Sequence, residues 1–150
     1  MKRILFVCLG NICRSPMAEF VMKDLVRKAG REGEFFIASA ATSSWELGNP
    51  VYPPARAILE AHGIDCTGKQ ARQLEMADYE RFDLLIGMDE RNLEDMRAIC
   101  GGDPEGKILP LLHWGSSLRQ VADPYFTGDF QTTWEDIREG CQGLLKALTE

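Results

Sequence analysis

The sequence predicts an α/β fold, a single domain in which a four-stranded parallel sheet carries helices on both faces. Short apolar runs alternate along the chain with longer segments whose apolar residues recur every three or four positions, as in alternating strands and helices. The strand-like runs lack a polar–apolar alternation, so we expect both of their faces to be buried. The 150 residues suffice for one domain, 1–150, that buries about two thirds of its unfolded surface.

The elements follow in order from these patterns and from the residues that begin or end helices. Pro16 suits the first turn of a helix, Gly63 ends a helix, and Asp89 can cap one. We expect strands at residues 3–7, 35–40, 83–88 and 107–111, and helices at residues 16–29, 55–62, 75–82, 90–100 and 130–148. Residues 42–54 and 113–128 should form loops, and a loop as long as the second is often functional.

Composition and charge argue against several classes of function. The apolar share of 45% and the charged share of 27% are typical of a globular domain, and no apolar run approaches the roughly 18 residues of a membrane span. The net charge is −6 without a basic stripe. Five cysteines without a CxxC pair, and two distant histidines, argue against a disulfide framework and a metal site. We expect a cytoplasmic protein with no cofactor, metal, nucleic-acid or membrane partner; the oligomeric state stays open.

The stretch between the first strand and the first helix carries the chemistry. Cys8 ends the strand, and Arg14 stands six residues later. Backbone N–H groups and the positive end of the helix dipole favour an anion in such a loop, and they also stabilise a thiolate. Arg14 can hold two phosphate oxygens with its planar guanidinium. A thiolate nucleophile and an oxyanion cradle in one loop predict phosphoryl transfer through a cysteinyl intermediate. The Walker and dinucleotide patterns are absent, which argues against nucleotide binding.

The remaining residues of this loop are assigned from their conformational and hydrogen-bonding properties. Gly10 and Asn11 tolerate the positive φ angles of a tight anion loop, whereas Ile12 should point outward along the pocket wall. Ser15 can donate its hydroxyl to the thiolate or cap the helix, and the two roles are compatible. The predicted phosphate-binding residues are Leu9, Gly10, Asn11, Ile12, Cys13, Arg14 and Ser15.

Asp123 is the candidate general acid, because expelling an alkoxide or phenolate benefits from a delivered proton. It lies in the long loop near the carboxyl ends of the strands, where such sheets bind ligands, and Pro124 biases it toward an extended conformation. By local sequence alone, a turn-forming role is the commoner one for an Asp before Pro. Asp89 and Asp129 compete for the role, although Asp89 at a helix start is more simply a cap.

Residues 7–19, Val-Cys-Leu-Gly-Asn-Ile-Cys-Arg-Ser-Pro-Met-Ala-Glu, resemble the signature loop of low-molecular-weight protein-tyrosine phosphatases. Further blocks appear in the order of that family at residues 39–43, 48–50, 62–64, 71–73, 88–90 and 123–125. The resemblance implies hydrolysis of protein phosphotyrosine and of small aryl phosphates through a phosphocysteine. Cys8 would be the nucleophile, Arg14 and the loop amides the phosphate cradle, and Asp123 the acid and then the base. The expected partners are tyrosine-phosphorylated proteins.

The resemblance also implies a substrate slot walled by aromatic rings. Trp45, Tyr125 and Phe126 match positions that flank the phosphotyrosine in the family. The alternative is that these rings simply pack beneath the loops. Phe126 departs from the tyrosine pair of many relatives, which leaves Tyr125 as the position there that could accept a phosphate.

A loop-shaping network is implied as well. Asn11, Ser15 and Ser39 resemble side chains that hold the loop in shape in the family. Relatives often place a His just before the Ala-Arg-Gln block, whereas this chain has Lys69 and Gln70 in that neighbourhood. Lys69 would pair with Asp89 or, more simply, be solvated.

The other cysteines divide into one possible redox partner and three core residues. Cys13 follows Cys8 by five residues, and relatives with this second Cys can form a reversible disulfide that shields the nucleophile. Packing as a small residue is the alternative. Cys66, Cys100 and Cys141 are expected to pack in the core.

Three other functions stay open. An arsenate reductase uses a similar loop with a relay of further cysteines, for which Cys66 and Cys100 are the candidates. A protein-arginine phosphatase shares the scaffold, but relatives of that kind carry Thr where this chain has Ile12. A catalytically silent phosphate-binding module is the third alternative.

Overall fold

The computed structural model describes residues 1–117 and 119–150. Its centre is a four-stranded sheet in the order β2-β1-β3-β4, and every neighbouring pair is parallel. The strands are β1 (Lys2–Cys8), β2 (Phe35–Ala41), β3 (Leu84–Gly87) and β4 (Ile108–Pro110). The α-helices are α1 (Arg14–Lys28), α2 (Pro53–Ala61), α3 (Asp78–Arg81), α4 (Glu90–Cys100), α5 (Pro124–Thr127) and α6 (Phe130–Thr149). Two 3-10 turns, η1 (Glu32–Glu34) and η2 (Leu111–Trp114), complete the described elements.

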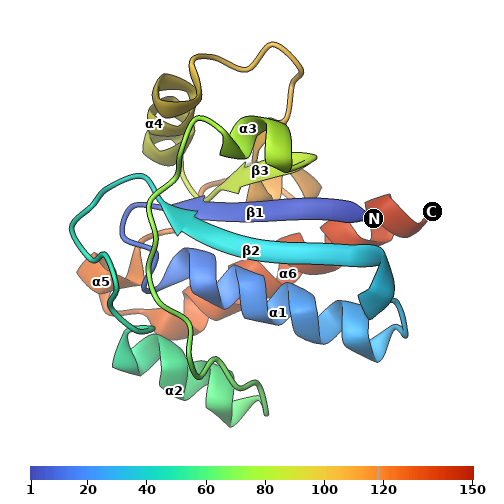
Figure 1. The fold of residues 1–150 in the computed structure, drawn as a ribbon. Helices are drawn as coiled ribbons and strands as arrows, with labels where there is room; N and C mark the ends of the chain where they lie inside the picture. The colour runs from blue at the N-terminus through green and yellow to red at the C-terminus, as the bar shows by residue number, and fades with distance from the viewer. Residues whose placement is uncertain (118) are drawn as a thin grey trace.

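Helices cover both faces of the sheet, as the sequence predicts. Figure 1 shows α1, α2 and α6 on one side and α3 and α4 on the other. Along β1, Ile4 and Phe6 pack into the larger core with α1 and α6, whereas Leu5 and Val7 pack into the smaller core with α3 and α4. All four side chains are fully buried. The absence of alternation in this strand therefore reflects burial on both faces.

The ends of several elements differ from the prediction. The first helix begins at Arg14, and its N-cap, Cys13, makes no side-chain capping bond. Ser15 is therefore inside the helix, and the capping role suggested for it is wrong. A short helix, α5, occupies part of the predicted long loop, since Asp123 accepts a hydrogen bond from the Tyr125 N–H at 3.1 Å and Pro124 takes the first helical position. Its four residues are too few to show a helical period.

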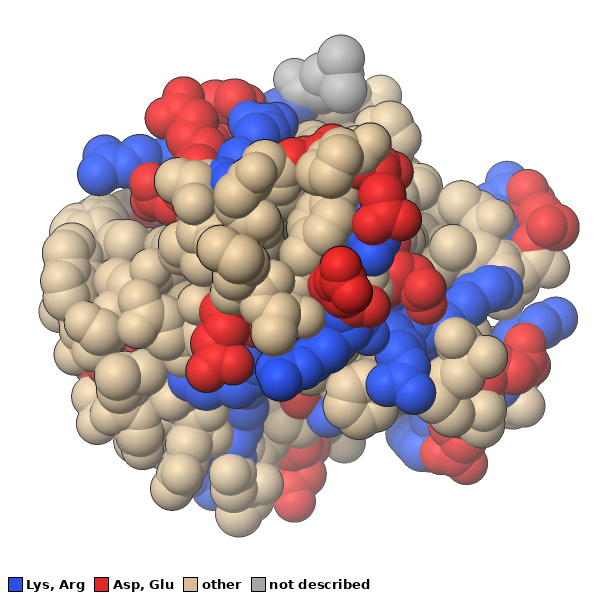
Figure 2. Space-filling view, turned by 45° about the horizontal axis from the view of Figure 1, so that its top comes forward, with Lys and Arg blue, Asp and Glu red and all other residues tan. Residues whose placement is uncertain are grey.

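Opposite charges lie beside each other on the surface. On the face drawn in Figure 2, groups of Lys and Arg adjoin Asp and Glu. Several pairs join neighbouring turns of one helix, such as Lys28 with Asp24 at 2.8 Å. Exposed pairs of this kind stabilise a fold by less than about 1 kcal/mol each. Within residues 1–117 and 119–150, no helix is long and apolar enough to cross a membrane.

Two helical glycines allow η2 to lie directly against α6. A Cβ at Gly140 would come within 2.5 Å of Leu111 Cγ, and one at Gly143 would come within 1.9 Å of the Trp114 carbonyl oxygen. The clash at Gly143 is with backbone, which cannot rotate away as a side chain can. This close approach fixes the start of the loop that leads to Asp123.

Gly143→Ala is expected to lower the free energy of unfolding by about 2 kcal/mol, because the added methyl group overpacks the contact with Trp114. The gain in helix propensity of about 1 kcal/mol offsets only part of this strain. Urea denaturation measures the change. Gln142→Ala, at an exposed position on the same helix, is the control and should change stability by less than about 0.5 kcal/mol. Equal stability of the two variants would contradict the close approach.

Candidate active site

Cys8 lies at the carboxyl end of β1 with its sulfur surrounded by donors. The Asn11 N–H donates to Sγ at 3.3 Å and the Ser15 N–H at 3.4 Å. The Ser15 hydroxyl lies 3.0 Å from the same sulfur. The side chain is almost fully buried at 3% exposure, so water competes little for these donors. Amide groups of a loop and of a helix N-terminus thus converge on one sulfur, an arrangement that stabilises a thiolate.

Asn11 connects the loop to its surroundings. It has a positive φ of 58°, which a residue with a short polar side chain tolerates. Its Nδ2 donates to Ser15 Oγ at 2.7 Å and to Ser39 Oγ at 2.9 Å, and its Oδ1 accepts from the Arg72 N–H at 3.2 Å. Because Ser15 Oγ accepts from Asn11, its own proton is directed to the near sulfur of Cys8 or to the more distant Ala40 carbonyl at 3.4 Å.

Behind this network lies a buried carboxylate, Glu19, that sequence analysis did not single out. Its Oε1 accepts from Ser39 Oγ at 2.5 Å and lies 3.4 Å from Lys69 Nζ, while its Oε2 lies 2.6 Å from Lys23 Nζ. Glu19 is one helical turn beyond Ser15, so the two share a face of α1. That spacing, together with an acidic residue in an otherwise apolar stripe, is the signal that could have identified it.

The structure corrects the expectation for Lys69. Its ammonium group contacts Glu19 and donates to the Ser39 carbonyl at 3.0 Å, and its side chain is only 12% exposed. It is therefore neither solvated nor paired with Asp89. Burial lowers the pKa of Lys69, although the charge of Glu19 acts in the opposite direction. The pairing arises because the segment around residue 70 folds over the edge of β2, where Arg72 accepts from the Ala41 N–H.

Arg14 lies on the other side of the loop, and its side chain is 2% exposed. One terminal nitrogen donates to Asp89 Oδ2 at 2.6 Å and to the Val121 carbonyl at 2.9 Å. The other lies 3.4 Å from Asp123 Oδ2. Burial alone would lower the pKa of Arg14, but the negative charges of Cys8, Asp89 and Asp123 outweigh it and raise the pKa. The guanidinium therefore carries its charge permanently in this site.

The competing carboxylates have separate positions. Asp89 caps α4, as predicted, by accepting from the Asn92 N–H at 2.8 Å, and it also holds Arg14. Asp129 caps α6, and hydrogen bonds from Thr132 lower its pKa. Asp123 combines the turn-forming role with a position beside the guanidinium. Its carboxylate thus faces the cavity that contains the Cys8 sulfur.

This cavity, of about 180 Å³, joins the predicted residues in one site. Cys8, Arg14 and Asp123 lie along it, and Trp45, Tyr125 and Phe126 border it. The three rings are 76%, 52% and 74% exposed, so they stand at the mouth instead of packing beneath the loops. The lining residues that sequence analysis did not assign to the site include Glu46.

Ile12 lies in the wall of the cavity, as expected, but it does not point into solvent. It is 9% exposed and packs with Cys13 and Ala71.

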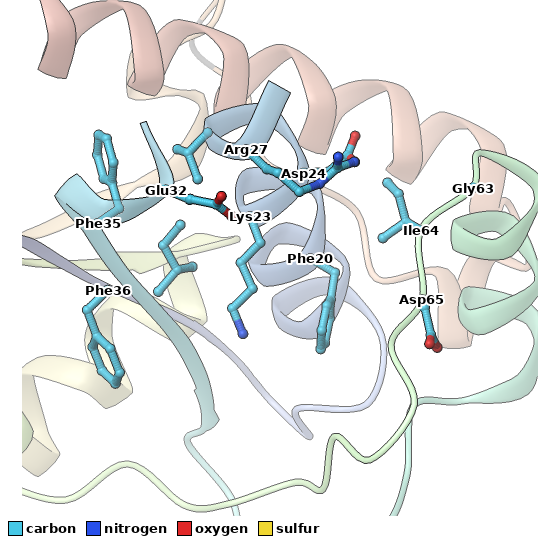
Figure 3. Close-up of a pocket in the computed structure, with 12 residues that line it drawn as sticks. Phe20, Lys23, Asp24, Arg27, Glu32, Phe35, Phe36, Gly63, Ile64 and Asp65 are labelled. Atoms are coloured by element: carbon cyan, nitrogen blue, oxygen red, sulfur yellow. The ribbon is translucent and has the colours of Figure 1, made fainter. Parts of the chain in front are cut away.

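A larger hollow of about 490 Å³ lies between α1, β2 and the segment after α2, where Phe20, Lys23 and Phe36 surround an open groove (Figure 3). Its lining has no cysteine, whereas the smaller cavity contains the Cys8 sulfur with its converging N–H donors.

All five cysteines are thiols in the structure. Burial raises the pKa of Cys13 to about 12, and the neighbouring charge of Cys8 acts in the same direction. Cys66 and Cys141 are buried, as expected, whereas Cys100 is only partly buried at the end of α4.

No group of three or more His, Cys, Asp and Glu side chains in the described part of the chain could hold a metal ion.

A family model described as low molecular weight phosphotyrosine protein phosphatase matches residues 3–150. The chain belongs to this family. The low molecular weight protein-tyrosine-phosphatase YfkJ of Bacillus subtilis is 41% identical over 150 residues, which cover 99% of this phosphatase and 96% of the relative. The family assignment and the α/β fold expected from the sequence are therefore both confirmed.

Solved structures agree with the assignment. The crystal structure of YfkJ from Bacillus subtilis superimposes on this phosphatase with a TM-score of 0.94 at 42% identity, covering 99% of this chain and 94% of that one. The Drosophila arginine phosphatase DARP superimposes with a TM-score of 0.91 at 30% identity, covering 100% of this chain and 99% of that one. The scaffold is thus common to proteins named for two different phosphorylated residues.

Lys69→Met is expected to lower the free energy of unfolding by about 1–2 kcal/mol, because Glu19 stays buried with one cation fewer. Lys23 still neutralises part of its charge, which limits the loss. Thermal or urea denaturation measures the effect. The matched control is Lys146→Met on α6, where the lysine side chain is 75% exposed. This substitution should leave the free energy of unfolding nearly unchanged. If Lys69→Met leaves the free energy of unfolding unchanged, the buried pair adds nothing to stability.

Proposed function

We propose that this phosphatase hydrolyses phosphotyrosine in proteins, and small aryl phosphates, through a phosphocysteine formed on Cys8. One observation carries the proposal: the Cys8 sulfur accepts one N–H group from the loop and one from the first turn of α1, in a cavity that Arg14 and Asp123 also line. A nucleophile, an anion cradle and a proton donor therefore meet in one small space.

In the first step the Cys8 thiolate attacks phosphorus in line with the leaving oxygen. The loop amides and Arg14 bind the equatorial oxygens, where negative charge accumulates. Asp123 donates its proton to the leaving phenolate oxygen as the P–O bond breaks. The guanidinium is already oriented by Asp89 and by the Val121 carbonyl, so little reorganisation is needed when the phosphate arrives.

In the second step Asp123, now ionised, takes a proton from water as the water oxygen attacks phosphorus. The S–P bond breaks, inorganic phosphate forms, and the thiolate of Cys8 is regenerated. Ser15 assists this departure, because its hydroxyl lies 3.0 Å from the sulfur and can donate to the developing negative charge. Asn11 keeps Ser15 in that orientation through its contact with Oγ.

The rings at the mouth support a preference for phosphotyrosine. Trp45, Tyr125 and Phe126 form a slot above the loop, and a phenyl ring is long enough to hold its phosphate at the base while stacking between them.

Cys13 remains a candidate partner for a reversible disulfide with Cys8. We also place the protein in the cytoplasm, because a thiolate nucleophile stays active in a reducing compartment.

Phosphoarginine is the second candidate substrate, favoured by the similarity to DARP. Against it stands Ile12, an apolar side chain in the cavity wall where, by the resemblance described above, arginine phosphatases have Thr. An arsenate reductase with a relay through Cys66 and Cys100 has less support, since these two residues pack on opposite faces of the sheet. A silent phosphate-binding module would bind phosphate without turnover.

Wild-type protein is expected to release phosphate from phosphotyrosine peptides much faster than from phosphoserine or phosphoarginine peptides, and to reduce no arsenate. Cys8→Ser is expected to abolish turnover while inorganic phosphate still binds, because the amides and Arg14 remain. Phosphate release and equilibrium binding measure the two properties. Faster turnover of phosphoarginine would replace the proposed substrate, and turnover retained by Cys8→Ser would exclude Cys8 as the nucleophile.

Asp123→Ala is expected to slow hydrolysis of phenyl phosphate by roughly 10²–10³-fold, within the range of general acid catalysis. The effect should be smaller with p-nitrophenyl phosphate, whose leaving group needs no proton. The single-turnover rate of phosphocysteine formation on each substrate separates this step from the second. The control is Asp129→Ala, which removes a helix cap but no group of the cavity. Equal slowing of both substrates by Asp123→Ala would contradict the acid role.

A further inference from the structure

A second groove of about 590 Å³ lies beside the catalytic cavity, between residues 49–53 and α2. Ile12 and Glu46 line both hollows, so the groove and the cavity are neighbours across one thin wall. In Figure 1 the chain that follows β2 runs past α5 to reach α2, on the side of the molecule where the catalytic loops lie. The hollow of about 490 Å³ shown in Figure 3 shares no lining residue with the catalytic cavity.

The groove is attached to the catalytic machinery through Tyr52. The Tyr52 N–H donates to the Ile12 carbonyl at 2.9 Å, which fastens the groove to the phosphate-binding loop. The Tyr52 ring lies 5.3 Å, centroid to centroid, from the ring of Tyr125 at the mouth of the slot. A substrate chain whose phosphotyrosine enters the slot therefore passes next to this groove.

Its lining combines apolar surface with three charged side chains, Glu46, Arg56 and Glu60. Pro50, Tyr52, Pro53 and Ala57 supply apolar surface, which suits the aliphatic stem of a long side chain. Glu60 is neutralised by Arg56 at 2.7 Å. Glu46 accepts a hydrogen bond from Asn49 at 2.5 Å, but among residues 1–117 and 119–150 no Lys or Arg pairs with it.

Glu46 also adjoins the place where a phosphate dianion would bind, since it lines the same cavity as Cys8 and Arg14. Two negative charges at close range repel each other, and a cation between them removes that repulsion. We propose that the groove binds a Lys or Arg that flanks the phosphotyrosine of a substrate protein. The stem lies on the apolar lining, and the charged group contacts Glu46. This inference rests on the proposed function and assigns it a sequence preference.

A set of eight short phosphotyrosine peptides tests the inference, each with a single Lys or a single Glu at one of the two positions on either side. The ratio of kcat/KM for the Lys peptide to that for the Glu peptide is compared at each position, so general effects of a substitution on catalysis cancel. For wild-type protein we expect a ratio of about five at one or more positions, which corresponds to a partly exposed ion pair.

Two variants locate the origin of the preference. Glu46→Gln removes the charge, and Ala57→Arg introduces a cation from the far side of the groove; both should bring the ratio close to one. Ala57→Gln, of comparable length but neutral, should keep the wild-type ratio. If wild-type protein hydrolyses p-nitrophenyl phosphate but shows a ratio of one at all four positions, the inference is wrong while the proposed function stands. A preference that persists in both charge variants also overturns the inference. Failure to hydrolyse p-nitrophenyl phosphate would remove the proposed function and the inference with it.

Discussion

The buried guanidinium of Arg14 is the constraint on which the rest of the site depends. Transferring such a charge out of water carries a penalty of several kcal/mol unless partners compensate for it. The compensation comes from parts of the chain that are far apart in sequence: Asp89 after β3, and Val121 and Asp123 after η2. Their convergence on one side chain brings Asp123, the proposed general acid, to the loop that follows β1. The same ion pairs that offset the penalty of burial therefore also bring the proposed catalytic residues together.

A second buried charge supports the loop from the opposite side. Glu19 lies on α1 one turn beyond Ser15. Its contacts continue from Ser39 to Asn11, from Asn11 to Ser15, and from Ser15 to the sulfur of Cys8. The amide of Asn11 and the hydroxyl of Ser39 each donate to a neighbour in this series, so the contacts are directed along it. The loop is thus held between a cationic and an anionic buried group. Such preorganisation places the amides before any substrate binds, which is what electrostatic catalysis requires.

The parts of the structure that depend on local pattern could be predicted, and the parts that depend on tertiary pairing could not. The burial of β1 on both faces follows from its uninterrupted apolar run. The loop after it follows from a cysteine and an arginine just before the helix signal of Pro16. The sequence indicates a helix start at Pro16, two residues after the observed start at Arg14, because Pro is a strong signal and the N-cap, Cys13, makes no side-chain capping bond. The local sequence gives no sign of the contact between Lys69 and Glu19, since only the fold of its segment over β2 brings the two side chains together.

The two carboxylates on Arg14 differ in a way that suits the proposed mechanism. Asp89 is held at 2.6 Å and also caps α4, whereas Asp123 lies at 3.4 Å from the other nitrogen and makes the weaker contact. A phosphate entering the cavity competes for the nitrogen that faces Asp123, because the opposite nitrogen is already saturated by Asp89 and Val121. We therefore expect phosphate binding to separate Asp123 from the guanidinium while Arg14 keeps its contacts with Asp89 and Val121. In the proposed mechanism the released carboxyl group is then free to donate its proton to the leaving oxygen, so substrate binding itself would prepare the acid for the bond that breaks.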